Sequence, residues 1–279
     1  MIPRSFRPAR RAQTHSQDGP GIVQAPAIPL DVPSLIQLRE TELEEARSLQ
    51  LSLLPNAPLR VSSAEFTSMF RAASAVGGDF LDYFHLSDNR IGIYLGDVVG
   101  KGLSAAMFAA LTVGTLRGIH KTGCPPMTVL STLNRRLRTR AVPGRYSAVQ
   151  YAVYDPETRE LLYSNAGLPR PIHFSNGACR EVGQGGLPPG LFDEAQYDQY
   201  SVVLEPGDAL LFLTDGLIEA HGPLPLREEF GSSRVMEICR QNLHSSPETL
   251  LSSLFSAVEE FTGHAAPQDD ITAALLRAS

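Results

Sequence analysis

The sequence is poor in cysteine, which limits how the fold can be cross-linked. The 279 residues include three cysteines, Cys124, Cys179 and Cys239, and no two of them form a CxxC pair. An odd number of widely spaced thiols argues against a disulfide framework and against a structural zinc site. A reducing compartment, the cytoplasm, is therefore the expected location.

Long hydrophobic runs are also missing. The longest apolar stretch, residues 103–116, has the length of a buried helix and is too short to span a membrane. The arginines near the N-terminus are followed by no apolar core of signal-peptide length, and Pro3 and Pro8 interrupt any helix there. Residues 1–33, rich in Pro, Gln, Arg and Ser, are predicted to form a flexible leader, and no membrane partner is expected.

The chain has no excess of positive charge. It carries 24 Lys and Arg against 30 Asp and Glu, a formal net charge of −6. This balance argues against a nucleic-acid partner, because phosphate contacts require cations. The basic run from Arg135 to Arg140 fits a solvated helix face better than a binding site. Hydrophobic residues make up 43% of the chain, which is enough apolar material for a packed core.

What is present is one amphipathic helix followed by a dense alternation of short strands and turns. Residues 34–54 have apolar residues at helical spacing with charges between them, and Pro55 ends the pattern. Beyond it, strands joined by tight turns, with helices grouped in pairs, favour antiparallel sheets with helices packed outside. The predicted strands are 66–73, 80–86, 91–96, 146–154, 160–165, 170–174, 200–204, 208–214 and 270–277, and the predicted helices after residue 55 are 102–120, 126–139, 233–243 and 247–261.

Aspartates recur where predicted apolar strands meet turns. Asp79 follows two glycines, Asp97 and Asp215 each end an apolar run, and Asp269 and Asp270 open the last strand. Turn chemistry alone also selects Asp and Gly, so any single one of these acids could be an ordinary turn residue. Together they suggest carboxylates that converge at one sheet edge, where they repel one another unless a cation neutralises them. Oxygen ligands without nearby His or Cys suit Mg²⁺ or Mn²⁺.

Other catalytic motifs do not match. The stretch GDVVGKG at residues 96–102 resembles a phosphate-binding loop. A Walker A motif, however, needs four residues between its first glycine and Gly-Lys, and a Ser or Thr after the lysine. Here three residues intervene and Gly102 follows Lys101. No GxSxG, HExxH or GxGxxG motif occurs. The histidines are scattered singly, so His85 and His173 are interpreted as structural.

Several short motifs occur in order along the chain. They are Ala75–Asp82, Gly96–Gly102, Leu213–Leu217 and Gln268–Thr272, together with Ser164–Gly167 and the helix segment Glu44–Pro55. These motifs resemble those of the metal-dependent protein phosphatase superfamily (PPM, type-2C-like). Within that superfamily, the bacterial RsbU/SpoIIE-type serine phosphatases are the most similar branch, and the resemblance covers residues 40–278. It implies an α+β fold, a four-layer α-β-β-α sandwich of two antiparallel sheets flanked by helix pairs.

The resemblance also assigns a metal site with two Mn²⁺ or Mg²⁺ ions. It makes Asp97 the carboxylate that bridges the two metals and the backbone carbonyl of Val98 a further ligand. The other implied ligands are Asp79, Asp215 and Asp269, with Asp270 less expected than Asp269. Ions about 3.5–4 Å apart would share a water and lower its pKa from ~15.7 toward neutrality, so that the water attacks phosphorus without a protein nucleophile.

The implied activity is hydrolysis of a phosphoserine or phosphothreonine protein, for example an anti-sigma-factor antagonist in bacterial signalling. Two departures from the family pattern are Lys101 and Leu168, where the family often has histidine. No counterpart of the arginine that binds phosphate in eukaryotic relatives can be placed from a motif. The alternatives are a catalytically inactive pseudophosphatase that binds partners and another two-metal hydrolase such as a nuclease, which the negative net charge disfavours.

These patterns divide the chain into three parts. Residues 1–33 form the leader, 34–55 an amphipathic linker or regulatory helix, and 56–279 the phosphatase catalytic domain. The helix has more apolar positions than an exposed helix needs, among them Leu35, Ile36 and Leu38. We therefore expect helix 34–54 to form a homodimer and to position the turn around Gly77 to Asp79, although a purely structural helix fits the imperfect heptad register equally well.

Overall fold

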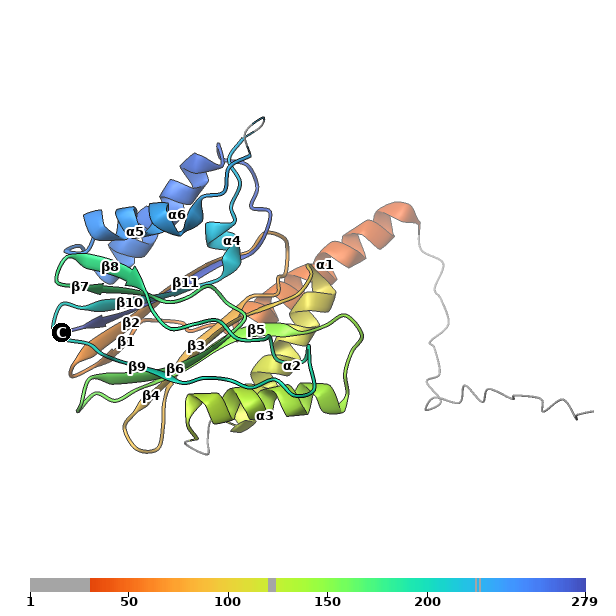
Figure 1. Cartoon of the computed structure of the whole chain (residues 1–279). Helices are drawn as coiled ribbons and strands as arrows, with labels where there is room; N and C mark the ends of the chain where they lie inside the picture. The colour runs from red at the N-terminus through yellow and green to blue at the C-terminus, as the bar shows by residue number, and fades with distance from the viewer. Residues whose placement is uncertain (1–30, 120–123, 224, 226) are drawn as a thin grey trace, which may run out of the picture. The chain divides into compact units, whose positions relative to one another are not determined.

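The computed structural model describes residues 31–119, 124–223, 225 and 227–279, and Figure 1 shows the arrangement of its elements. The chain divides into two compact units, residues 1–39 and residues 40–279. The boundary falls within the first helix, α1 (Val32–Leu51). The predicted leader lies outside the described residues up to residue 30.

Helix α1 begins two residues earlier than predicted. Asp31 explains the difference, because its Oδ1 accepts the backbone N–H of Ser34 at 3.2 Å and its carbonyl accepts that of Leu35 at 3.0 Å. An aspartate in this position satisfies N–H groups that have no partner within the helix. Pro33 is tolerated in the first turn, where its missing N–H is not needed.

Two antiparallel sheets form the centre of the second unit. Within the described residues, one sheet has the strand order β1-β2-β11-β10-β7-β8 and the other has the order β3-β4-β5-β6-β9. The strands are β1 (Leu59–Val61), β2 (Ala64–Arg71), β3 (Phe80–His85), β4 (Ile91–Val98), β5 (Ser147–Tyr154), β6 (Glu160–Ala166), β7 (Ile172–Ser175), β8 (Ala178–Glu181), β9 (Tyr200–Val203), β10 (Ala209–Leu213) and β11 (Ile271–Ala278).

Helix pairs cover the outer faces of both sheets, as Figure 1 shows. Helices α2 (Leu103–Ile119) and α3 (Pro126–Thr139) share an apolar cluster with the β3–β4–β5 side of the second sheet. Helices α5 (Gly231–Gln241) and α6 (Pro247–Phe261) share another with β7, β10 and β11. A third cluster lies between the two sheets. The predicted four-layer α-β-β-α sandwich is thus confirmed.

Strand β10 shows why the strands near the centre read as continuous apolar runs. All five of its residues are buried. Leu210 and Phe212 belong to the cluster between the sheets, whereas Leu211 and Leu213 belong to the cluster beneath α5 and α6. Because successive side chains point to opposite faces, a strand covered on both sides must be apolar at every position.

Three short elements were not predicted: β1, β8 and α4 (Asp215–Ile218). Strands β1 and β8 are the two edges of their sheet, and both are only partly buried. Short, half-exposed edge strands lack the apolar alternation from which longer strands are recognised. Helix α4 is a single turn and too short to show a helical period.

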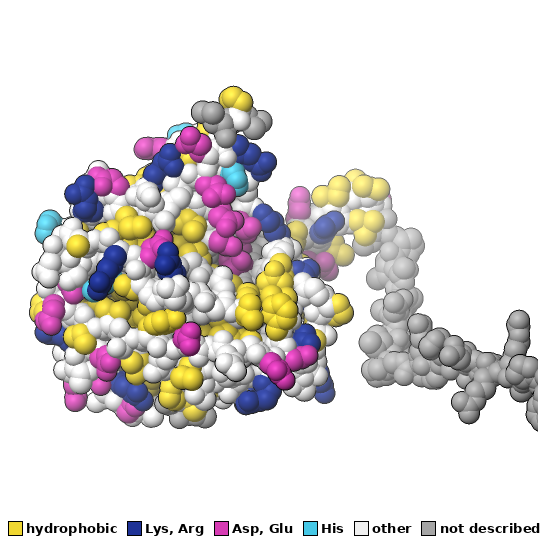
Figure 2. All heavy atoms as spheres, in the orientation of Figure 1, with side chains coloured by type: hydrophobic (Ala, Val, Ile, Leu, Met, Phe, Trp, Pro, Cys, Tyr) yellow, Lys and Arg dark blue, Asp and Glu magenta, His cyan; other side chains and the backbone are white. Residues whose placement is uncertain are grey.

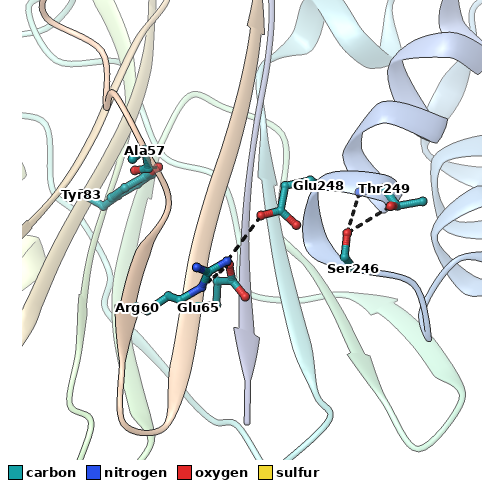
Figure 3. Close-up of polar contacts among 7 residues, drawn as sticks. All are labelled: Ala57, Arg60, Glu65, Tyr83, Ser246, Glu248 and Thr249. Atoms are coloured by element: carbon teal, nitrogen blue, oxygen red, sulfur yellow. Dashed lines mark hydrogen bonds and ion pairs between the residues drawn. The ribbon is translucent and has the colours of Figure 1, made fainter.

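Polar contacts fix the segment that leads from α1 into the sheets (Figure 3). Arg60 Nη2 on β1 lies 2.6 Å from Glu65 Oε1 on β2 and 3.8 Å from Glu248 Oε1 on α6. The Tyr83 hydroxyl donates to the Ala57 carbonyl at 2.8 Å. Exposed ion pairs contribute about 1 kcal/mol or less, so these contacts mainly orient the edge strand.

The start of α6 follows its sequence signal. The Ser246 hydroxyl accepts the backbone N–H of Thr249 at 3.2 Å (Figure 3), and Pro247 occupies the first turn. No helix in the described part of the chain combines the length and hydropathy needed to cross a bilayer.

Candidate functional site

Two of the predicted site acids are brought together by one hairpin. Asp97 is the penultimate residue of β4, and Asp79 immediately precedes β3. The antiparallel register pairs Phe80 with Gly96, so the end of β4 lies beside the start of β3. Antiparallel pairing therefore places both aspartates at one end of the second sheet.

The first sheet brings the other acids together in the same way. Asp215 begins α4 directly after β10, and Asp269 and Asp270 directly precede β11. Strands β10 and β11 are antiparallel, with Leu213 paired to Ala273. The end of one strand and the start of the other therefore lie side by side at one end of the first sheet.

Hydrogen bonds join these ends of the two sheets to each other. Asp79 Oδ2 accepts a hydrogen bond from the Thr214 hydroxyl at 2.9 Å and another from the Thr272 hydroxyl. Both threonines are fully buried, and Asp79 is 2% exposed. A buried carboxylate needs such donors. The aspartate at the start of β3 is therefore bonded to the first sheet beside Asp215 and Asp270.

Asp270 holds the glycine turn that precedes Asp79. Its Oδ2 accepts the N–H of Gly78 at 2.7 Å and that of Asp79 at 3.3 Å, and its Oδ1 accepts the N–H of Ala73 at 2.8 Å. A Cβ at Gly77 would lie 1.7 Å from Asp270 Oδ2, so the turn requires glycine there. The Asp270 carboxylate is occupied by backbone donors.

The Val98 carbonyl faces the same turn. A Cβ at Gly78 would stand 2.7 Å from the Val98 carbonyl oxygen and 3.0 Å from Asp97 Oδ1. The turn thus requires glycine at this position, because a side chain would collide with the Val98 carbonyl. The resemblance implied the Asp97 carboxylate as the bridge between two metals and the Val98 carbonyl as a further ligand, and the two groups lie close together here.

The carboxylates raise one another's pKa. Burial and then the charge of Asp215 raise the pKa of Asp97 to about 7. Burial, followed by the charge of Asp97, raises the pKa of Asp79 well above its usual range. Burial and the charge of Asp269 also raise the pKa of Asp215. Such mutual repulsion marks a place where a cation would be stabilising.

The donor set fits a divalent ion in its chemistry. It consists of carboxylate and carbonyl oxygens, the ligands that Mg²⁺ and Mn²⁺ prefer. Within the described ranges, however, no three carboxyl, imidazole or thiol groups already form a ready-made metal site. The carboxylates would therefore have to close around an ion.

Asp269 faces outward, unlike Asp270. Its side chain is 46% exposed, and its Oδ2 lies 3.1 Å from Lys101 Nζ. A pocket of about 140 Å³ is lined by Asp215, Glu219 and Asp269 among others. Figure 2 shows acidic side chains gathered on this face of the molecule, over the region of α4.

Gln50 and Arg145 support the site but were not identified from the sequence. The Gln50 side chain pairs with both backbone groups of Gly77, donating to its carbonyl at 2.9 Å and accepting its N–H at 3.0 Å. Arg145 donates to the Val99 carbonyl at 2.5 Å and to the Ser104 hydroxyl at 2.7 Å. These contacts span 27 and 41 or more positions, so no local pattern reveals them.

Thr214 and Thr272 were also missed as site residues. Each lies within one of the short motifs that carry the family resemblance, next to or two residues from an acid. Their proximity in sequence to Asp215 and Asp270 was the available signal. Their role as donors to Asp79 becomes apparent once the two sheets are in place.

Comparisons with known proteins agree with this architecture. The family Stage II sporulation protein E (SpoIIE) matches residues 87–279. The chain is 27% identical over 237 residues to Protein IcfG of Synechocystis, covering 75% of this chain and 37% of that protein. It is 24% identical over 245 residues to Phosphoserine phosphatase RsbU of Bacillus subtilis, covering 85% and 70%. The chain thus spans roughly one to two thirds of these relatives.

The same fold occurs among solved structures. The SiaA-PP2C domain of Pseudomonas aeruginosa superposes with a TM-score of 0.77 at 20% identity, covering 89% of this chain and 99% of that domain. The fold is thus that of a type-2C phosphatase domain. The chain belongs to the SpoIIE family, in the RsbU/SpoIIE branch of the PPM superfamily.

Proposed function

We propose that this chain is a metal-dependent protein-serine/threonine phosphatase. In this proposal Asp79, Asp97, Asp215, Asp269 and the Val98 carbonyl hold two Mn²⁺ or Mg²⁺ ions. The observation that carries it is the meeting of four strand-end acids from both sheets. Burial, followed by neighbouring carboxylate charges, raises the pKa of Asp79, Asp97 and Asp215. Buried carboxylates that repel one another destabilise the fold, so such a cluster is expected where function requires it.

Divalent ions bound at this site would activate water for attack on phosphorus and offset charge on the phosphoryl oxygens. The protein's own residues supply the scaffold. Asp97 Oδ1 and the Val98 carbonyl oxygen lie close to Gly78, in the turn that leads to Asp79. Thr214 and Thr272 hold Asp79 in one orientation, so this carboxylate is positioned before substrate arrives.

Asp269 is the ligand we favour over Asp270. Asp270 already accepts hydrogen bonds from three backbone N–H groups and maintains the turn at Gly78. Asp269 has an outward-facing carboxylate on the wall of the pocket that it shares with Asp215. Asp270 is therefore assigned to hold the turn in place.

The proposed substrate is a phosphoserine or phosphothreonine protein, such as an anti-sigma-factor antagonist. The printed function of RsbU, a phosphoserine phosphatase, supports this class. Residues 56–279 would form the catalytic domain and residues 34–55 the regulatory helix. A cytoplasmic location in bacterial signalling completes the proposal, supported by the small number and wide spacing of the cysteines.

A substrate panel tests the proposal against its alternatives. The purified full-length chain is incubated with Mn²⁺ and, separately, a phosphoserine protein, a phosphothreonine protein and DNA. Release of inorganic phosphate from the phosphoproteins, with intact DNA, is expected. Cleavage of DNA would favour a nuclease, and binding of phosphoprotein without phosphate release would favour a pseudophosphatase.

Phosphoserine should be preferred over phosphotyrosine. The printed function of the relative RsbU, a phosphoserine phosphatase, supports this preference. With matched phosphopeptides, kcat/KM should be about tenfold or more higher for phosphoserine. Faster turnover of the phosphotyrosine peptide would contradict the assigned specificity.

Arg145 should strengthen metal binding indirectly. Its guanidinium donates to the carbonyl of Val99, the residue after Val98. The following residue, Gly100, adopts a φ of +99°. Arg145→Ala is expected to weaken Mn²⁺ affinity about tenfold, the usual size of an outer-shell effect. Isothermal titration of Mn²⁺ measures it, with Arg140→Ala in the preceding exposed segment as the control. Equal Mn²⁺ affinities for Arg145→Ala and wild type would remove Arg145 from the site.

A further inference from the structure

Lys101 is a cation at the carboxylate cluster whose role the proposed mechanism does not yet use. It lies in the loop between β4 and α2, between Gly100 and Gly102, whose φ angles of +99° and +70° favour glycine. Its ammonium donates to the Gln268 carbonyl and lies 3.1 Å from Asp269 Oδ2. The loop after β4 therefore places the Lys101 side chain beside the residues that precede β11 in the first sheet.

Lys101 lines two adjacent hollows of this surface. One, of about 140 Å³, includes Asp215 and Asp269. The other, of about 90 Å³, includes Gly77, Asp269 and Asp270. Burial and Asp269 raise the pKa of Asp215, and the positive charge of Lys101 offsets part of that rise, so its field reaches both acids. A group that reached the cluster from either hollow would pass this ammonium.

The other cation that lines the larger hollow is already engaged. Arg71 Nη2 lies 3.1 Å from Glu259 Oε2, and its guanidinium carbon lies 5.8 Å from the centre of the Phe255 ring. These contacts hold Arg71 against α6. The Lys101 side chain, in contrast, is 58% exposed, and an ion pair this exposed is worth about 1 kcal/mol or less.

We infer that Lys101 binds the phosphoryl group of the substrate, a phosphate monoester dianion, once Asp215 and Asp269 have bound divalent ions; the inference rests on the proposed function. An Asp269 carboxylate that binds a divalent ion attracts an ammonium less strongly, so Lys101 is released from it. The flexible stem and three donors of lysine suit contact with phosphoryl oxygens. Lys101 thus exchanges one anionic partner for another.

The test compares Lys101→Met, which keeps length without charge, with Lys101→Arg, which keeps the charge. For Lys101→Met we expect KM for a phosphoserine peptide and the inhibition constant of inorganic phosphate to rise about tenfold, with a smaller change in kcat. Lys101→Arg should restore most of both. Arg135→Met, on the exposed face of α3, is the control for loss of a surface cation.

Mn²⁺ binding provides a measurement that does not depend on activity. Lys101→Met should bind Mn²⁺ as tightly as wild type or more tightly, because a competing cation has left Asp269. Weaker Mn²⁺ binding would overturn the inference, since it would show a structural role in the metal site. Unchanged KM and phosphate inhibition in Lys101→Met would overturn it too. A wild-type chain that binds no Mn²⁺ and releases no phosphate would overturn the proposed function, and the inference with it.

Discussion

Asp97→Asn is expected to reduce phosphate release from a phosphoserine protein by about 10³-fold or more, equivalent to ~4 kcal/mol of transition-state stabilisation. Burial raises the pKa of Asp97, and the charges of Asp215, Asp269 and Asp270 raise it further. Loss of this charge should remove the bridging position for both ions. Asp215→Asn is expected to have the same effect.

The folded protein should survive this change and gain stability without metal. The pKa of Asp97 is about 7 in the folded chain and about 4 when unfolded. The folded state therefore binds more protons between about pH 4 and 7, and stability falls as pH rises through that window. At pH 8 the Asp97→Asn protein should be more stable by an amount on the order of 1 kcal/mol, measured by urea unfolding.

Asp88→Asn is the matched control for Asp97→Asn. Asp88 lies at the turn between β3 and β4, the other end of the same hairpin, where it pairs with Arg90. It should retain wild-type activity and metal dependence. Full activity of Asp97→Asn and Asp215→Asn would reject the proposed two-metal site.

A chain that starts at Asn56 is expected to be monomeric, less active and weaker in metal affinity than the full chain. The shortened chain lacks α1 and therefore Gln50, whose side chain pairs with both backbone groups of Gly77. Gly77 lies two residues before Asp79, so the helix contact fixes the turn that leads into the site. None of the described residues of α1 is buried, which leaves its apolar residues available to a second copy.

Gln50→Ala isolates the contact without removing the helix. We expect Mn²⁺ affinity to fall about tenfold, with Glu45→Ala on the same helix as the control. Light scattering gives the mass of the full and shortened chains, and calorimetry gives their Mn²⁺ affinities. If the shortened chain keeps the oligomeric state and the metal dependence of the full chain, the helix is a structural cap on the fold and not a switch.

The ends of the strands could be predicted because local chemistry determines them. Asp97, Asp215 and the Asp269–Asp270 pair each lie at the border of a long apolar run, and such runs in buried strands are visible in sequence. That these ends meet also follows from antiparallel pairing. The four-layer architecture came from the grouping of strands and helices, together with the family resemblance.

The rest depends on contacts between distant segments. The outward orientation of Asp269 and the backbone bonds of Asp270 appear only when the glycine turn lies against β11. Gln50 and Arg145 act through side chains that reach backbone groups elsewhere in the chain. Sequence spacing does not indicate which distant backbone groups these side chains contact, because tertiary packing determines those contacts.

The most direct test of the central claim is a Mn²⁺ titration of the EDTA-treated full-length chain, with phosphate release from a phosphoserine protein and bound Mn²⁺ measured in the same samples. The proposed site predicts no release without metal and activity that rises as Mn²⁺ occupies about two sites per chain. Full phosphate release in EDTA, or tight occupancy of both sites without any release, would contradict it.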